Sequence, residues 1–311
     1  MPESPLHGLG MDAFERFLFL RTVPTLSGLP IEVVRVIAAH ARQARFGDGE
    51  FLHRQGQPAT CLHYVVEGGI EIRRHGHPVR ELSARAIAGG AAGVAGDDQV
   101  YDGVALGPTT TLRLGSAELQ GVMEDHFVLL RRVLATTGSE AIAALKQLGP
   151  GAGFQPPGRA MDCPGRPLDL VERMAFLRQS AVLGEAHIEA VSDLASEVVE
   201  IRLPAGEPIW DVGETSTHFL MPLRGLVECE AMHPSQRFVR GALDSVGSIE
   251  ALAGRPRWFR ARVKEDLVAL KVDIEVFYDV LEDHFEMAMT LLQQLALASV
   301  ALDDARAGAN A

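Results

Sequence analysis

A cluster of basic residues surrounds one tryptophan late in the chain. The stretch EALAGRPRWFRARVKED, residues 250–266, holds Arg255 and Arg257 just before Trp258 and three more cations after it. Guanidinium groups form charge-assisted hydrogen bonds to phosphate and carboxylate, so the cluster is typical of an anion site. A strand with one solvated face is the other interpretation, because charged and apolar residues alternate after Trp258. That alternation sets Arg260, Arg262 and Lys264 against Phe259, Ala261 and Val263. It does not account for Arg255 and Arg257.

Two histidines and a glutamate form a second cluster, with the spacing of metal ligands. In GIEIRRHGHPVRE, His75, His77 and Glu81 follow Gly69, a spacing that resembles the first metal motif of the cupins. Residues two apart on a strand face the same way, as metal ligation requires. However, HGHP is also typical of a turn between strands, and no later element supplies a further histidine ligand. We therefore favour a hairpin tip and keep a cupin-like metalloenzyme only as a third hypothesis.

The segments EDHF at 124–127 and 282–285 place an aspartate beside a histidine twice, at His126 and His284. Adjacent residues on a helix do not face one another, which favours capping or surface contacts over a catalytic dyad. The chain also lacks a nucleophile elbow, a P-loop and a dinucleotide fingerprint. We therefore expect a protein that is not an enzyme and has no metal site.

The bulk properties limit the classes of partner. The 311 residues carry 29 Lys plus Arg against 41 Asp plus Glu, a net charge of −12. A chain this acidic is repelled by nucleic acid and by anionic membranes, so neither is expected as a partner. No apolar run approaches the ~20 residues that span a bilayer, and the N-terminus lacks a signal pattern. Cys61, Cys163 and Cys229 lack disulfide or zinc spacing, which favours reduced thiols in a cytoplasmic protein.

The chain contains an internal duplication. FERFLFLRTVPTL near the start reappears as VERMAFLRQSAVL, so that Glu15 and Glu172 lie 157 positions apart. GDGEFLHRQGQ and PAGEPIWDVGE keep that offset, and VMEDHF and VLEDHF depart from it by one residue. So long a period indicates a doubled domain rather than a solenoid. We predict domains at 12–136 and 169–298, a Gly- and Pro-rich linker at 137–168, and a tail at 299–311.

Each copy has the same order of predicted elements. Helical spacing comes first, followed by short strand-like runs between Gly-bearing turns. The apolar positions of these first helices are Val33, Val34, Ile37 and Ala38, and then Ile188, Val191 and Leu194. Each copy closes with a long amphipathic helix that contains the EDHF segment. The predicted fold class is α+β, with two tandem antiparallel β-rolls, each flanked by helices.

The strand pattern of both copies resembles the cyclic nucleotide-binding domain family. FGDGEFLHRQGQPATCLHYVVEGGIEI and LPAGEPIWDVGETSTHFLMPLRGLVEC are similar to the family's Gly-Glu turn, apolar pair and glycine-bounded strand. The resemblance covers residues 12–136 and 169–298. It implies a phosphate-binding cassette, in which the N-terminus of a short helix and an arginine hold the cyclic phosphate. A carboxylate in the cassette accepts a hydrogen bond from the ribose hydroxyl.

In the second copy the cassette corresponds to VGSIEALAGRPRWFRA. The resemblance places Gly247 at the opening turn, Ser248 where the family has its ribose-binding Glu, and Arg257 at the phosphate. Glu250 reaches the sugar only if the short helix starts late, and Trp258 either stacks on the base or packs in the roll. The ligand, if one binds, is expected to be cAMP or cGMP. The candidate ligand-binding residues are Gly247, Ser248, Ile249, Glu250, Arg257 and Trp258.

The first copy departs further from the family pattern. AGGAAGVAGDDQVYDG keeps Gly89 and Gly96, but Gly90 stands in place of the carboxylate and Gln99 in place of the arginine. The Asp97–Asp98 pair adds negative charge where a phosphate would bind. We expect this first pocket to stay empty and to serve as a structural partner for the second copy.

Family members couple these domains to an output such as a kinase, a channel or DNA-binding helices, and no such module follows the second copy. We therefore expect a non-catalytic regulatory or adaptor protein that senses a cyclic nucleotide at its second domain and signals through its helices to a protein partner. The alternative is a scaffold whose pockets have lost their ligand. Apolar residues on the last helix also favour a homodimer. They are Leu291, Leu292, Leu295 and Leu297.

Overall fold

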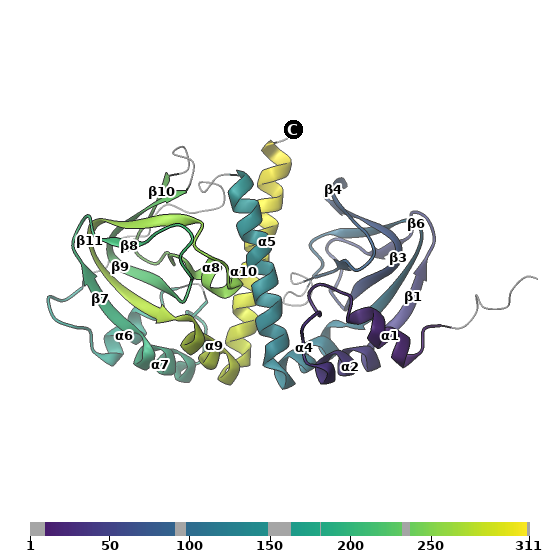
Figure 1. Ribbon diagram of the computed structural model, residues 1–311, viewed down its shortest axis with the longest axis horizontal. Helices are drawn as coiled ribbons and strands as arrows, with labels where there is room; N and C mark the ends of the chain where they lie inside the picture. Colours follow the sequence, from purple (N-terminus) through teal and green to yellow (C-terminus); the bar gives the residue numbers. More distant parts are fainter. Residues whose placement is uncertain (1–9, 91–97, 149–162, 181, 232–236, 310–311) are drawn as a thin grey trace, which may run out of the picture. The chain divides into compact units, whose positions relative to one another are not determined.

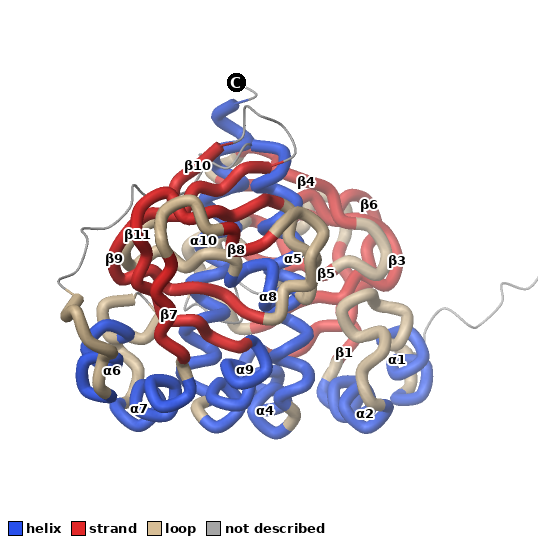
Figure 2. The backbone as a smooth tube through the Cα atoms, turned by 60° about the vertical axis from the view of Figure 1, so that its left-hand side comes forward, coloured by secondary structure: helices blue, strands red, loops and turns tan. Residues whose placement is uncertain are grey.

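The computed structural model describes residues 10–90, 98–148, 163–180, 182–231 and 237–309. The chain forms two compact units, of which the first ends at Val133 and the second begins at Leu134. Each unit contains one antiparallel β-roll with helices before and after it (Figure 1, Figure 2). The predicted α+β class with two rolls is therefore confirmed.

The first roll lies between two pairs of helices in the chain. The helices are α1 (Ala13–Leu20), α2 (Ile31–His40), α4 (Ser116–Asp125) and α5 (Phe127–Leu148). The strands are β1 (Arg42–Phe46), β2 (Phe51–His53), β3 (Cys61–Arg74), β4 (His77–Leu82), β5 (Ile87–Ala88) and β6 (Asp102–Gly115). They pair in the order β1-β6-β3-β4, with β2 on β6 and β5 on β3. Val65, Ile70 and Ile72 on β3 are buried in a core that Leu52 and Tyr101 complete.

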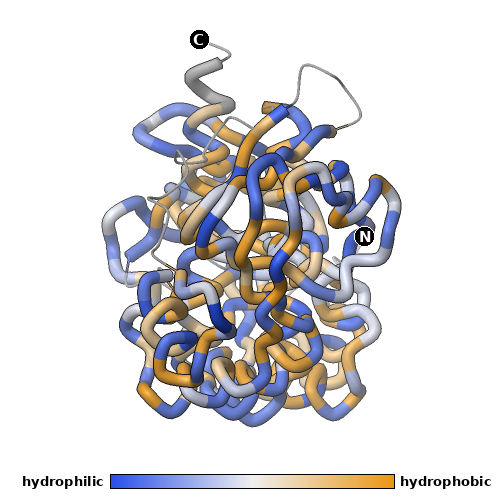
Figure 3. Tube along the Cα trace, turned by 90° about the vertical axis from the view of Figure 1, so that its left-hand side faces the viewer, coloured by the Kyte–Doolittle hydropathy of each residue, from blue (hydrophilic) through white to orange (hydrophobic). Residues whose placement is uncertain are grey.

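The second roll repeats this plan. Its helices are α6 (Leu170–Leu177), α7 (Ile188–Glu197), α8 (Ser248–Ala253), α9 (Ile274–Asp283) and α10 (Phe285–Ala309). Its strands are β7 (Val199–Leu203), β8 (Pro208–Trp210), β9 (His218–Ala231), β10 (Arg237–Arg240) and β11 (Phe259–Asp273), in the order β10-β9-β11-β7 with β8 on β11. The expected alternation on β11 is confirmed, with Phe259, Ala261 and Val263 buried and the cations exposed. Figure 3, which faces this unit, shows hydrophilic and hydrophobic residues interspersed along the trace.

Matching elements recur in the two units at the predicted offset. α1 and α6 each begin with a capping box, in which an aspartate and a glutamate satisfy each other's backbone N–H groups. The Glu15 amide donates to Asp12 Oδ1 at 2.8 Å, and the Glu172 amide donates to Asp169 Oδ1 at 2.9 Å. The two copies therefore share local hydrogen bonds as well as strand order.

Three expectations about the helices require correction. The closing helix of each copy is broken at its EDHF segment, where His126 and His284 leave helical geometry with φ of −136° and −126°. His284 Nε2 lies 2.8 Å from Asp193 Oδ2 on α7, a surface contact and not a dyad with its neighbour Asp283. Ile188, expected to face the core, is 55% exposed because it is the first residue of α7. Residues 137–148 of the expected linker and 299–309 of the expected tail are helical.

The last helix, α10, is the one described helix long and apolar enough to cross a membrane by length and composition. Its segment Phe285–Ala305 has a mean hydropathy of 1.4, which corrects the expectation that no segment approaches this length. The core helix of a soluble protein meets the same criteria, and 44% of this window is buried against the protein. Of the leucines expected at a dimer contact, Leu292 and Leu295 are already buried within the chain, whereas Leu297 is 47% exposed.

Candidate functional site

The cassette of the second roll begins with a glycine in a backbone conformation that other residues rarely adopt. Gly247 has a φ of 81°, in the left-handed region, and precedes the six-residue helix α8. A Cβ atom at this position would lie 2.2 Å from a terminal nitrogen of Arg257 and 2.9 Å from the Trp210 ring. The glycine therefore makes room for the guanidinium that the sequence associates with phosphate binding.

The side chain of Arg257 is buried and forms hydrogen bonds to backbone carbonyls. Its side chain is 2% exposed, and its guanidinium carbon lies 3.9 Å from the centroid of the Trp210 ring. Nη1 donates to the Gly247 carbonyl oxygen at 2.9 Å, and Nη2 donates to the carbonyl oxygen of His218. Burial lowers the pKa of Arg257 to about 10, which leaves it charged at neutral pH. Both terminal nitrogens of Arg257 thus bind backbone carbonyls of the cassette. The resemblance to the family predicted instead that they would face a ligand.

The acidic residue of the cassette is also buried. Glu250 is 4% exposed, and burial raises its pKa above the ordinary value, although Arg257 favours the charged form. The indole N–H of Trp258 also favours the charged form of Glu250, although the indole and the carboxylate do not meet the geometry of a full hydrogen bond. Ser248, at the family's ribose position, has its Oγ 2.7 Å from Ser245 Oγ. An interior carboxylate with this little exposure opposes the entry of a second anion.

Aromatic side chains fill the hollow of the second roll. Trp258 is 7% exposed and stacks on Phe238, with ring centroids 6.2 Å apart and planes at 22°. Its edge contacts Phe259 at 5.4 Å, and Phe238 meets Phe259 at 5.2 Å. The cavity that remains, between Ile249, Glu250 and this cluster, measures about 80 Å³. Small-molecule sites typically measure ~300–1,000 Å³, so this cavity is smaller than a typical nucleotide site.

The first roll has the same arrangement without the charge. Gln99 is 4% exposed, and its Nε2 donates to the Cys61 carbonyl at 3.5 Å. Cys61 lies 157 positions before His218, whose carbonyl Arg257 binds, so Gln99 and Arg257 occupy equivalent places. Gly89 has the same left-handed φ of 81° as Gly247. A neutral amide, Gln99, thus occupies in the first copy the place that Arg257 has in the second, whereas Gly96 and Asp97 lie outside the described residues.

The histidines proposed as metal ligands lie at a hairpin tip, as expected. β3 ends at Arg74 and β4 begins at His77, so His75 and Gly76 form the turn between them. The His75 backbone N–H donates to the side-chain oxygen Oε1 of Gln55 at 2.9 Å. Within the described ranges, no three His, Cys, Asp or Glu side chains come together to hold a metal ion.

A polar group that the sequence patterns do not predict lies inside the first roll. His63 is 2% exposed, with Nδ1 3.0 Å from Thr111 Oγ1 and Nε2 3.6 Å from Cys61 Sγ. His53 lies beside it, with ring centroids 6.4 Å apart, and its buried Nδ1 has no hydrogen-bond partner among the described residues. The only signal in the sequence was a histidine at an inward position of the apolar run CLHYVV.

This buried histidine predicts acid sensitivity of the first unit. Burial lowers the pKa of His63 to about 3, with the neighbouring His53 and Arg113 adding to the effect. Its stabilising contribution is complete above its unfolded pKa of ~6.5 and is lost as the pH falls toward 3, because only the unfolded chain takes up the proton. From pH 7 to pH 5 we expect His63 to reduce the free energy of unfolding by about 2 kcal/mol.

Urea unfolding of wild type and His63→Gln, followed by circular dichroism at both pH values, measures this contribution. The wild type should lose about 2 kcal/mol more than the variant on acidification. His77→Gln, at the exposed hairpin tip, is the matched control and should follow the wild type. Equal pH dependence in wild type and His63→Gln would rule out a neutral buried histidine.

Comparisons with known proteins place one part of the chain in a family. Residues 43–126 match the family model of the cyclic nucleotide-binding domain, whereas no curated protein sequence matches the chain. Among solved structures, the chain is similar to the regulatory domain of Toxoplasma gondii PKA with cAMP, at 14% identity and a TM-score of 0.35. That similarity covers 92% of this chain and 98% of that chain.

Two further structures show low similarity of the same kind. The regulatory subunit of a cAMP-independent protein kinase A from Trypanosoma brucei is 14% identical, with a TM-score of 0.35 and coverage of 89% of this chain and 91% of its own. The sensor domain of the transcriptional regulator DNR from Pseudomonas aeruginosa is 18% identical, with a TM-score of 0.37 and coverage of 40% and 91%. The sequence of residues 43–126 thus matches one cyclic nucleotide-binding domain, and the second unit repeats the elements of that roll.

Proposed function

We propose that this chain is a non-catalytic regulatory or adaptor protein whose second roll keeps its shape without a cyclic nucleotide and acts by contact with a protein partner. The observation that carries this proposal is the position of Arg257. Its terminal nitrogens are bonded to the Gly247 and His218 carbonyls, and its charge is buried against Trp210. In the family, the cassette arginine binds the phosphate of the ligand. Here the guanidinium of Arg257 binds carbonyl oxygens of the protein instead.

A sensor of cAMP or cGMP is the second candidate. The family match of residues 43–126 and the survival of Arg257 favour it. Binding at the second cassette would require Arg257 to leave two carbonyls and Trp258 to leave its contacts with Phe238 and Phe259. Buried carbonyls left unpaired cost ~1–3 kcal/mol each, and a ligand would have to offset that loss.

Calorimetric titration of the full chain with cAMP and cGMP, up to millimolar concentration, tests the proposal. We expect no saturable heat from binding at the cassette, and no rise in the melting temperature of the second unit that depends on Arg257. For comparison, a ligand present at 100 times its Kd would add ~2.7 kcal/mol to the free energy of unfolding. Saturable binding that Arg257→Lys abolishes would overturn the proposal in favour of the sensor, because lysine keeps the charge but loses the planar fork.

A further inference from the structure

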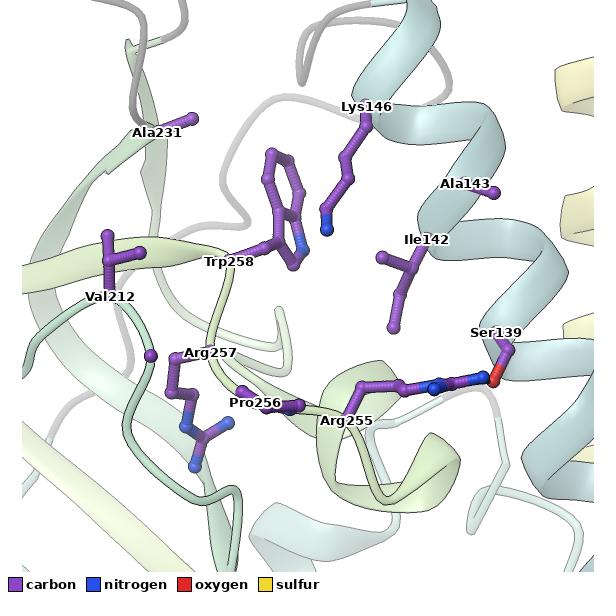
Figure 4. Close-up of a pocket in the computed structure, with 11 residues that line it drawn as sticks. Ser139, Ile142, Ala143, Lys146, Val212, Ala231, Arg255, Pro256, Arg257 and Trp258 are labelled. Atoms are coloured by element: carbon purple, nitrogen blue, oxygen red, sulfur yellow. Dashed lines mark hydrogen bonds between the residues drawn. The ribbon is translucent and has the colours of Figure 1, made fainter.

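The second unit has a larger hollow outside its roll. It lies between the C-terminal part of α5, the turn before β9 and the segment from Arg255 to Trp258 (Figure 4). Its volume is about 650 Å³, eight times that of the cavity inside the roll and within the range typical of small-molecule sites. The two spaces share Trp258 as a wall, but the outer one does not include α8.

The charge of this outer pocket is opposite to that of the chain. Lys146 on α5 and Arg255 after α8 both line it, and no carboxylate does among the described residues. Within the part of the chain that the structure describes, neither cation forms an ion pair, and the one side-chain hydrogen bond of Arg255 runs from Nε to Ser139 Oγ at 3.2 Å. In a protein with a net charge of −12, this makes the pocket a local attractor for anions.

The remaining walls of the pocket are apolar. Ile142 and Pro256 face it, and Figure 4 shows Ile142 and Lys146 reaching from α5 toward the ring of Trp258. The indole Nε1 of Trp258 is buried and makes no hydrogen bond to a described residue. The indole ring offers a flat apolar surface, which suits a planar ligand.

We infer that the outer pocket binds a small organic anion with a planar apolar body. The anionic group lies between Lys146 and Arg255, and the planar body packs against Trp258 and Ile142. The two cations come from different elements, so a bound anion ties α5 to the turn that follows α8. This site is separate from the cassette and does not depend on a cyclic nucleotide.

Titration with 1-anilinonaphthalene-8-sulfonate, a sulfonate on a planar naphthalene ring whose fluorescence rises in apolar surroundings, tests the site on the full chain. We expect one saturable site per chain and weaker binding at higher salt. The double variant Lys146→Glu/Arg255→Glu should weaken binding at least about tenfold, or ~1.4 kcal/mol. Ala143→Phe, at an exposed position that lines the pocket, should weaken it similarly by filling the space without a change in charge.

The matched control is Arg224→Glu/Lys264→Glu, which makes the same change in net charge at exposed positions outside the pocket. Its affinity should stay within about twofold of wild type. Unchanged affinity in both pocket variants, or an equal loss in the control, would overturn the inference. The same variants separate this site from the cassette in nucleotide titrations. Heat that Lys146→Glu/Arg255→Glu removes belongs to the outer pocket, whereas heat that remains counts against the proposed function.

Discussion

Replacement of Arg257 by alanine is expected to lower the free energy of unfolding of the second unit by about 3–5 kcal/mol. The substitution leaves the Gly247 and His218 carbonyls without their donors and removes the cation beside buried Glu250. It also removes the guanidinium that packs on Trp210. An arginine kept only for a ligand would not produce such a loss, because its contacts in the free protein would be with water.

Tryptophan fluorescence during urea unfolding measures this effect directly, since both tryptophans of the chain, Trp210 and Trp258, lie in the second unit. Arg260→Ala is the matched control. Its ion pair with Asp211 is half exposed on both sides, so the cost should stay below about 1 kcal/mol. A loss as small as this in Arg257→Ala would mean that the guanidinium is not structural, and the sensor would become the better hypothesis.

The second large effect concerns a glycine in the long hairpin of the second roll. Gly225 has a φ of 88°, and a Cβ there would lie 2.2 Å from the carbonyl oxygen of Asp266 on the facing strand. Its counterpart in the first roll, Gly68, has the same conformation and a Cβ contact of 2.6 Å with the Pro108 carbonyl. Gly225→Ala should therefore cost at least about 3 kcal/mol, because the ~1–2 kcal/mol of left-handed backbone adds to the displacement of a strand.

Gly206→Ala separates these two contributions. Gly206 has a φ of 90°, but a Cβ there meets nothing within 4 Å, so only the backbone cost of ~1–2 kcal/mol applies. The same fluorescence measurement compares the two variants. Equal losses would show that β9 and β11 approach each other less closely at Gly225 than the structure indicates.

The two rolls share one fold, although the equivalent position of their cassettes carries a charge in only one of them. The family match falls on the first roll, in which neutral Gln99 occupies the place of the arginine. In both rolls the polar side chain at this place bonds to the carbonyl of the equivalent residue, Cys61 or His218. The position therefore supports the cassette whether or not it carries charge.

The sequence by itself determined the duplication, the order of helices and strands, and the exposed cations of β11. These features follow from local periods, since alternation on a strand and 3.6-residue spacing on a helix need no knowledge of distant residues. Because the copies lie 157 positions apart, the elements predicted for one copy also predict those of the other. The same reasoning did not detect the helix breaks at His126 and His284, because the apolar pattern continues across them.

Only the tertiary structure decided where the candidate site residues point. Arg257 binds a carbonyl 39 positions away, and His63 meets Thr111 at a distance of 48 positions along the chain. The end of α5, expected to be linker, instead lines the outer pocket of the second unit. Sequence type shows that a residue carries a charge or a ring. Whether that group faces a ligand, water or a backbone carbonyl depends on which distant segments pack around it, and burial and hydrogen bonding then fix its chemistry.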